Sequence, residues 1–157
     1  MDRQTYVEAY FALMEAGELL RYHVERQLRT DADLSYVQFR ILALLSESPS
    51  RSATMTDLAD TVVYSRSGTT YQARQLEQAG LITRQQSPQD ERATIVTITD
   101  TGRERLSKAL PGHLQLVERE LFSPLSDTDV LAMQDVLTRI RNQLRASPPR
   151  STVRGAK

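Results

Sequence analysis

The feature that most constrains the fold is a run of two short helical patterns and two strand patterns between residues 54 and 99. Residues 54–61 and 65–79 have the apolar spacing of short helices, and Gly80 follows the second where helices commonly end. Residues 81–85 and 94–99 have strand patterns, the second alternating polar and β-branched side chains. The polar stretch between the strands predicts a hairpin with a projecting tip. This order predicts two helices that meet at a corner and are followed by a β-hairpin.

Two long helical patterns flank this segment. Residues 5–29 and 127–144 are each predicted to form one helix with an apolar stripe. The stripes consist of Tyr6, Tyr10, Leu13, Leu20, Val24 and Leu28 in the first helix, and Val130, Met133, Leu137, Ile140 and Leu144 in the second. The second stripe has the spacing of a coiled-coil seam. Such stripes can pack inside a monomer, but together they exceed what a small core needs and favour a partner subunit.

Two further helices complete the predicted order. Ser35 and Gln38 form a capping-box pattern at the start of a helix whose apolar run spans residues 39–45. Residues 46–53 are rich in turn-forming side chains. A helix resumes near residue 100, and a kink or break is expected at Pro111 and Gly112. The Pro-, Ser- and Arg-rich residues 147–157 are predicted to be a disordered tail.

The composition narrows the possible chemistry. The chain has no cysteine, which excludes disulfides, thiol catalysis and thiolate metal sites. Twenty basic residues balance twenty acidic ones, so a nucleic-acid partner requires a local concentration of positive charge. The sequence contains no transmembrane-length apolar run and no signal-peptide pattern, so a cytoplasmic location is expected. Motifs of hydrolases, phosphate-binding loops and zinc peptidases are absent, so no enzyme, cofactor or metal site is predicted.

The two predicted short helices have an apolar back and a polar front, as a helix-turn-helix requires. Leu58, Val62, Ala73 and Leu76 supply an apolar back. Small and polar residues occupy the front of the second helix: Ser65, Arg66, Ser67, Thr69, Thr70, Tyr71 and Arg74. Small hydroxyl side chains allow a helix to approach the major groove closely, and free backbone N–H groups at its start can meet phosphate oxygens. Serine and threonine also cap helices without any ligand, and both roles can coexist.

Four motifs in register then identify a family resemblance. They are the small-residue helix 65–74, the exit Leu76-Glu77-Gln78-Ala79-Gly80-Leu81, the turn Asp90-Glu91-Arg92, and the re-entry Ile98-Thr99-Asp100-Thr101-Gly102. Together they resemble the MarR family of bacterial and archaeal transcription regulators over about residues 55–105, with Ile98 in a position that is usually leucine. The resemblance implies a mainly α fold with a small β-hairpin wing (α+β), a winged helix-turn-helix with N- and C-terminal dimerisation helices. It implies a single unit over residues 1–146, with dimerisation helices at 5–34 and 101–146 and the winged helix-turn-helix at 35–100.

The resemblance also implies a function. A homodimeric regulator of this family binds a pseudo-palindromic site on double-stranded DNA, and repression is the default expectation. Residues 65–74 then correspond to the major-groove reader, Arg92 to the wing arginine that enters the minor groove, and Asp90 to the acid that braces the wing. The chain departs from the family at Val63, where glycine is common, and at Tyr71, where many relatives have a basic residue. The alternative is a dimeric ligand- or protein-binding module of the same fold that lacks specific DNA binding.

Family resemblance further implies a small aromatic effector that binds between the dimerisation helices and the winged lobe. The candidate lining residues are His23, Tyr36, Phe39, Arg40 and His113, and the alternative is that they are ordinary core. His113 follows the Pro111-Gly112 pair, and we expect that it could sense a ligand or the pH.

Overall fold

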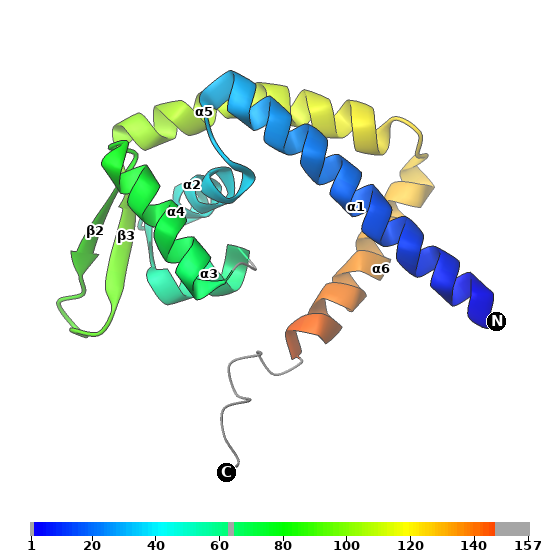
Figure 1. Ribbon diagram of the computed structural model, residues 1–157, viewed down its shortest axis with the longest axis horizontal. Coiled ribbons are helices and arrows are strands. Elements are labelled where there is room, and N and C mark those ends of the chain that lie inside the picture. Colours follow the sequence, from blue (N-terminus) through cyan, green and yellow to red (C-terminus); the bar gives the residue numbers. More distant parts are fainter. Residues whose placement is uncertain (1, 63–64, 147–157) are drawn as a thin grey trace, which may run out of the picture. The chain divides into compact units, whose positions relative to one another are not determined.

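The computed structural model describes residues 2–62 and 65–146, and its contacts divide the chain into two units, Met1–Val117 and Glu118–Lys157. The first unit contains α1 (Arg3–Ala32), α2 (Tyr36–Glu47), β1 (Ser52–Thr54), α3 (Met55–Val62), α4 (Arg66–Gln78), β2 (Ile82–Gln86), β3 (Thr94–Ile98) and α5 (Asp100–Val117) (Figure 1). The second contains a π-helical turn, Glu118–Phe122, and α6 (Asp127–Ala146). The predicted order of helices and hairpin is confirmed, and the fold is mainly α with a small antiparallel sheet. The predicted 147–157 tail and Val63 lie outside the described residues.

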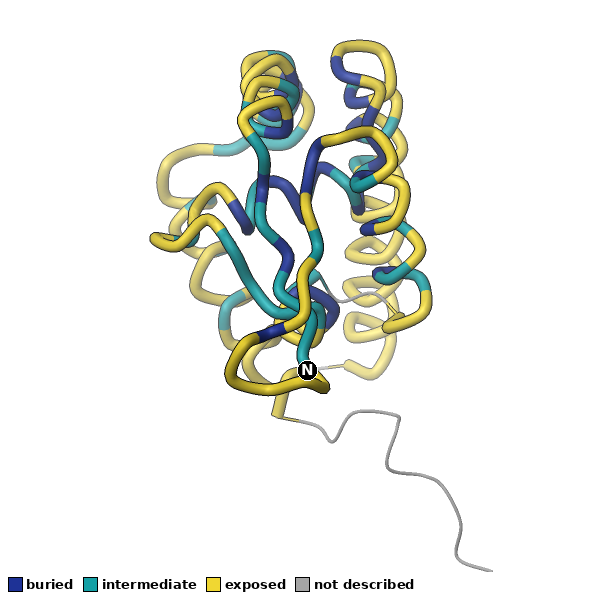
Figure 2. Tube along the Cα trace, turned by 90° about the vertical axis from the view of Figure 1, so that its left-hand side faces the viewer, coloured by how far each residue is buried: buried dark blue, intermediate teal, exposed yellow. Residues whose placement is uncertain are grey.

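The core of the first unit lies where α1, α2, α4, α5 and the sheet meet, as the dark segments of Figure 2 show. Ser35 caps α2 as its sequence pattern predicts: its hydroxyl accepts a bond from the Gln38 N–H, and the Gln38 side chain accepts one from the Ser35 N–H. The fully buried side chains of the core include Leu28, Ile41, Leu42, Leu45, Leu58, Leu76, Leu81 and Val96. Burial of each such side chain stabilises the fold by roughly 1.5–3 kcal/mol.

The sheet corrects the prediction for residues 46–53. The described residues form an antiparallel sheet in the order β1-β3-β2. β1 takes up Ser52 and Ala53, which were predicted to be only turn-rich, and Thr54, which was predicted to begin a helix. Its register pairs Ser52 with Thr97 and Thr54 with Ile95. A strand of three residues is too short to show an alternation of polar and apolar side chains. β1 therefore forms because β3 offers it a free edge.

The α5 helix corrects part of a second prediction, because the break that was one of the two expected outcomes at Pro111 and Gly112 does not occur. It continues through Pro111 and Gly112 to Val117 without a break. Proline removes one backbone hydrogen bond, but the neighbouring turn gains a contact from α1, because the Gln27 side-chain amide donates to the Ala109 carbonyl at 3.2 Å. A side chain at Gly112 would overlap the carboxylate of Asp31, so glycine permits this close approach of the two helices. The helical geometry changes only at Glu118, where the π-helical turn begins.

Gly102 is fixed by a similarly close approach. It lies at the start of α5, where its N–H donates to the Thr99 hydroxyl, and a β-carbon there would overlap the carbonyl oxygen of Leu81. We expect Gly102→Ala to lower the free energy of unfolding by about 1–3 kcal/mol, because the overlap is with backbone rather than a flexible side chain. Chemical denaturation measures the effect. Gly17→Ala is the control, since a β-carbon there meets no atom within 4 Å; equal stability of the two variants would contradict this packing.

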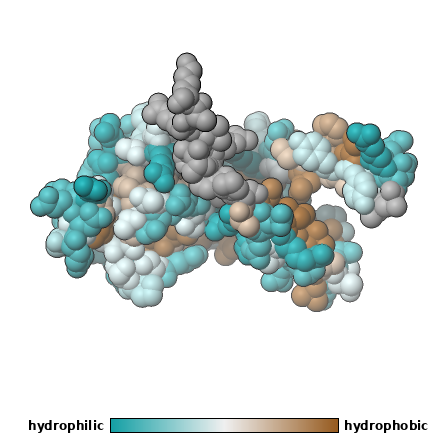
Figure 3. Space-filling model, turned by 90° about the horizontal axis from the view of Figure 1, so that it is seen from below, coloured by the Kyte–Doolittle hydropathy of each residue, from teal (hydrophilic) through white to brown (hydrophobic). Residues whose placement is uncertain are grey.

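The helices predicted to mediate dimerisation expose large apolar side chains. In α1 these are Tyr6, Val7, Tyr10, Phe11, Leu13, Met14, Leu19 and Tyr22. In α6, described by itself, they are Leu131, Val136, Leu137, Ile140 and Leu144. Hydrophobic residues are visible at the surface where α1 begins (Figure 3). A single subunit leaves these stripes uncovered.

Candidate nucleic-acid interface and adjoining pocket

The start of α4 presents polar groups to solvent. Ser65 is its N-cap, with an extended backbone and a hydroxyl that accepts a bond from the Gly68 N–H at 3.1 Å. Ser65, Arg66 and Ser67 are all exposed. The first turn of a helix carries a partial positive charge and unpaired N–H groups, both of which favour a phosphate.

The exposed face of α4 continues along one stripe. Ser67, Tyr71 and Arg74 follow one another at spacings of four and three residues, and Tyr71 is 59% exposed. Thr70 is half-buried, and its hydroxyl donates to the Arg66 carbonyl at 2.9 Å. Thr69 requires a correction: it is completely buried on the core side of the helix, so its side chain is not part of the exposed face. A surface of two arginines, a tyrosine and small hydroxyl groups remains.

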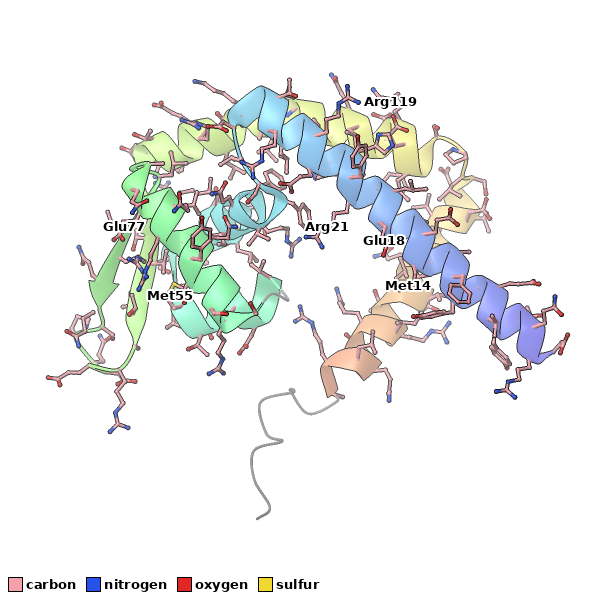
Figure 4. The ribbon with its side chains drawn as sticks, viewed as in Figure 1. Met14, Glu18, Arg21, Met55, Glu77 and Arg119 are labelled. Atoms are coloured by element: carbon pink, nitrogen blue, oxygen red, sulfur yellow. The ribbon has the colours of Figure 1, made fainter. Side chains whose placement is uncertain are left out.

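The other end of α4 is tied to the hairpin. Gly80 has a φ of 72°, a left-handed conformation that favours glycine, and the Leu81 N–H donates to the Leu76 carbonyl at 2.9 Å. Arg84 of β2 donates two hydrogen bonds to the Glu77 carboxylate, at 2.9 and 2.5 Å. These bonds hold the pKa of Glu77 below its usual range. Glu77 lies at the end of α4 nearest the hairpin (Figure 4). The pair, to which sequence analysis assigned no role, fixes the hairpin relative to α4.

The hairpin tip is shaped by Asp90. Its carboxylate accepts a bond from the Arg92 N–H at 2.9 Å, and its carbonyl accepts one from the Ala93 N–H at 2.9 Å. The side chain of Arg92 is exposed and, within the described residues, has no ion-pair partner. The carboxylate therefore organises the turn and leaves the guanidinium free for a ligand.

Comparison with known proteins identifies this arrangement. The sequence model of the MarR family matches residues 34–94, which run from the start of α2 to the first residue of β3. The chain is 30% identical over 111 residues to the uncharacterised HTH-type transcriptional regulator YdgJ of Bacillus subtilis, a match that covers 71% of the chain and 66% of that protein. It is 25% identical over 134 residues to the HTH-type transcriptional regulator MhqR of the same organism, covering 85% of the chain and 90% of that protein. The chain belongs to the MarR family.

Solved structures of MarR proteins agree with this assignment. Sco3205 of Streptomyces coelicolor, a MarR family transcriptional regulator solved in complex with DNA, superposes with a TM-score of 0.88 at 29% identity over 94% of this chain and 92% of that one. AbsC, another MarR family regulator of that organism, gives a TM-score of 0.84 at 28% identity over 92% and 97%. The protein is thus a transcriptional regulator with a MarR-type winged helix-turn-helix.

A pocket of about 340 Å³ lies between α1, α2 and α5 of this MarR lobe. Tyr36, Phe39, Arg40 and His113, four of the five candidate ligand residues, line it together. His23 does not: it is exposed, with its ring edge-on to that of Tyr22. Sequence analysis missed the α1 and α5 residues of the wall, which are Gly17, Leu20, Arg21, Val24 and Val117. Leu20 and Val24 could have been predicted as pocket residues, because they belong to the apolar stripe that the sequence predicts for α1.

His113 is a half-buried polar residue of this wall. Its ring lies 4.7 Å from that of Phe39, centroid to centroid, and its Nδ1 atom is buried without a hydrogen-bond partner among the described residues. Burial lowers the pKa of His113. The imidazole is therefore neutral near pH 7 and retains an unused hydrogen-bonding site.

Two further features are absent from the described residues. No three His, Cys, Asp or Glu side chains among them are grouped in a way that could hold a metal ion. None of the helices described here is long and apolar enough to cross a membrane.

Proposed function

We propose that the protein is a homodimer that binds a specific sequence of double-stranded DNA and represses transcription, and that a small aromatic ligand modulates its affinity for DNA. The observation that carries this proposal is that the polar face of α4 and the wing arginine are both exposed. The first turn of α4 and the hairpin tip lie at the same side of the lobe (Figure 1). A duplex on that side would receive Ser67, Tyr71 and Arg74 in its major groove and Arg92 in the adjacent minor groove. The existence of a DNA complex of Sco3205, whose fold is similar, supports the proposal that this lobe binds DNA.

Dimerisation is supported by the exposed apolar stripe of α1. Its ring and aliphatic side chains, Tyr10 and Phe11 among them, would be buried against a second copy of the chain. A two-fold axis then presents two winged lobes to DNA. Half-sites should be separated by about one helical turn, roughly 10 base pairs, so the operator should be pseudo-palindromic. We propose a cytoplasmic location, because the proposed target is DNA, and we propose no catalytic activity for the protein.

The effector site proposed is the pocket between α1, α2 and α5. Its volume falls in the range of small-molecule sites, and Phe39 and Tyr36 supply aromatic surface. Because α1 would be a dimerisation helix and α2 packs on α4, a ligand here would contact both the dimer interface and the support of the reading helix. A ligand that favours one separation of the two winged lobes would change the affinity of the dimer for its operator.

Salt titration tests DNA binding against the alternative of a module that has lost it. Arg66, Arg74 and Arg92 offer three exposed cations per lobe, so a dimer can neutralise up to about six phosphates and the slope of log affinity against log salt should be about −5. Fluorescence anisotropy with a labelled duplex measures that slope. A slope near zero, or no binding at low salt, would favour the alternative module.

A further inference from the structure

Tyr71 is a large aromatic residue on an otherwise polar face of α4. It is 59% exposed and lies between Ser67, one turn earlier, and Arg74, one turn later. The side chains that α4 buries in the core leave from the opposite face, at Ala73 and Leu76. Helical phase therefore directs the ring of Tyr71 into solvent, on the face that we propose meets DNA.

The described structure gives the side chain of Tyr71 no internal role. Its hydroxyl makes no hydrogen bond with a described residue, and its ring is not paired with another described aromatic ring. The residues one turn earlier on α4, Ser67 and Gly68, are small and leave the ring uncovered on that side. Exposed aromatic rings with one polar end are enriched where proteins bind their partners. A contact with a ligand of this face explains Tyr71 better than folding does.

The major groove of DNA offers an aromatic ring one kind of apolar partner. Every base pair presents hydrogen-bond donors or acceptors there, and among the four bases only thymine adds a methyl group, at C5. A polar base edge that loses its water to a ring, without gaining a hydrogen bond, is penalised. A ring on the floor of the groove therefore favours thymine over cytosine at the same position.

The spacing along α4 lets three side chains reach neighbouring base pairs. Four residues advance an α-helix by about 6 Å and three by about 4.5 Å, whereas successive base pairs are about 3.4 Å apart. Ser67 and Arg74 recognise base edges through hydrogen bonds, and arginine prefers the O6 and N7 acceptors of guanine. Tyr71, between them, adds a selection for apolar surface that hydrogen bonds do not make.

We propose that Tyr71 is a specificity-determining residue, which selects one thymine in each half-site of the operator by packing its ring on the C5 methyl group. The inference rests on the DNA-binding function proposed above and specifies how one base is chosen. The contact is apolar, so it depends on the ring and the methyl group and not on the phenol oxygen. Two-fold symmetry places the two selected thymines at equivalent positions of the half-sites.

A scan that replaces each thymine by deoxyuridine tests the proposal, because this change removes only the C5 methyl group. The probe is a labelled duplex that the full chain has selected from a randomised library, and fluorescence anisotropy measures its affinity. Burial of one methyl group is worth roughly a fourfold change in affinity, so removal of both methyl groups at one symmetric pair of positions should weaken binding roughly 15-fold. Cytosine at these positions should also bind weakly, and 5-methylcytosine should recover part of the loss.

Three variants locate the effect of the methyl group. Tyr71→Phe keeps the ring and should retain the preference for thymine over deoxyuridine. Tyr71→Ala should bind the two duplexes equally, and circular dichroism should show an unchanged fold, because the side chain is exposed. Arg92→Ala is the matched control: it should weaken both duplexes and leave their ratio unchanged, since a minor-groove contact does not meet the C5 methyl group.

Either of two results would overturn the proposal: a selected duplex on which no symmetric pair of deoxyuridines lowers affinity, or a methyl effect of undiminished size in Tyr71→Ala. Binding of the selected duplex by the parent protein separates this failure from failure of the proposed function. A protein that binds the duplex with either result refutes only thymine selection by Tyr71. A protein that binds no duplex refutes the DNA-binding function and this inference together.

Discussion

Phe11→Glu should convert the proposed dimer to a monomer at micromolar concentration. Phe11 lies on the exposed apolar stripe of α1, with 63% of its surface accessible in one subunit and its ring edge-on to that of Tyr10. A charge on that stripe would be desolvated in the interface without a partner, which costs more than the loss of the aromatic contact alone. Sedimentation velocity measures the change.

Loss of the dimer should also reduce operator affinity. Two lobes on one rigid dimer make the second contact intramolecular, so we expect a decrease of about 100-fold or more on a two-half-site duplex. Affinity for a single half-site should change little. Ser107→Glu is the control, because it adds the same charge at an exposed polar position of α5. A Phe11→Glu protein that remains dimeric at micromolar concentration would show that α1 is not the interface.

Arg92→Ala should weaken DNA binding by about 1–3 kcal/mol, which corresponds to roughly 5- to 150-fold. The guanidinium is exposed at the hairpin tip, and the described structure gives it no internal role, since Asp90 binds only the backbone N–H of this residue. The free energy of unfolding should therefore stay within about 0.5 kcal/mol of the parent.

Arg26→Ala supplies the control for net charge, because it removes an exposed arginine of α1. Titration of a labelled operator with both variants makes the comparison. If both lose the same affinity, the wing has no specific contact and its arginine acts only through overall charge.

The sequence predicts the elements whose signals are local. The capping box at Ser35 and the helix end at Gly80 each depend on a few consecutive residues, and the structure contains both. The hairpin is equally local, because alternation and a polar turn specify it. These signals were sufficient for the fold and for the family.

The features that sequence analysis missed depend on partners distant in the chain. Strand β1 exists only through its pairing with β3, and α5 tolerates Pro111 where α1 packs closely against it. Thr69 is an exception, because its burial was readable: it precedes Ala73 by four residues and Leu76 by seven, which places it on the buried stripe. The hydroxyl group of Thr69 suggested a place on the exposed face of α4. The helical phase, however, determines on which face of a helix a residue lies.

The pocket residues also divide into those that a local pattern groups and those that only the fold brings together. Phe39, Tyr36 and Arg40 belong to one helix and could be grouped from sequence alone. Their meeting with His113 depends on how α5 crosses α2, which no local pattern encodes. His23 lies next to Val24 on α1 but off the buried stripe, so neighbourhood in sequence was misleading there.

Selection from a randomised duplex library tests the central claim most directly. Purified protein should enrich a pseudo-palindrome with half-sites about 10 base pairs apart, since two lobes related by a two-fold axis read the same sequence in opposite directions. Sequencing the bound fraction identifies the site, and Arg92→Ala and Tyr71→Ala should lower or alter its enrichment. Recovery of a two-fold symmetric site would establish a sequence-specific dimeric regulator. Failure to enrich any sequence would contradict that account.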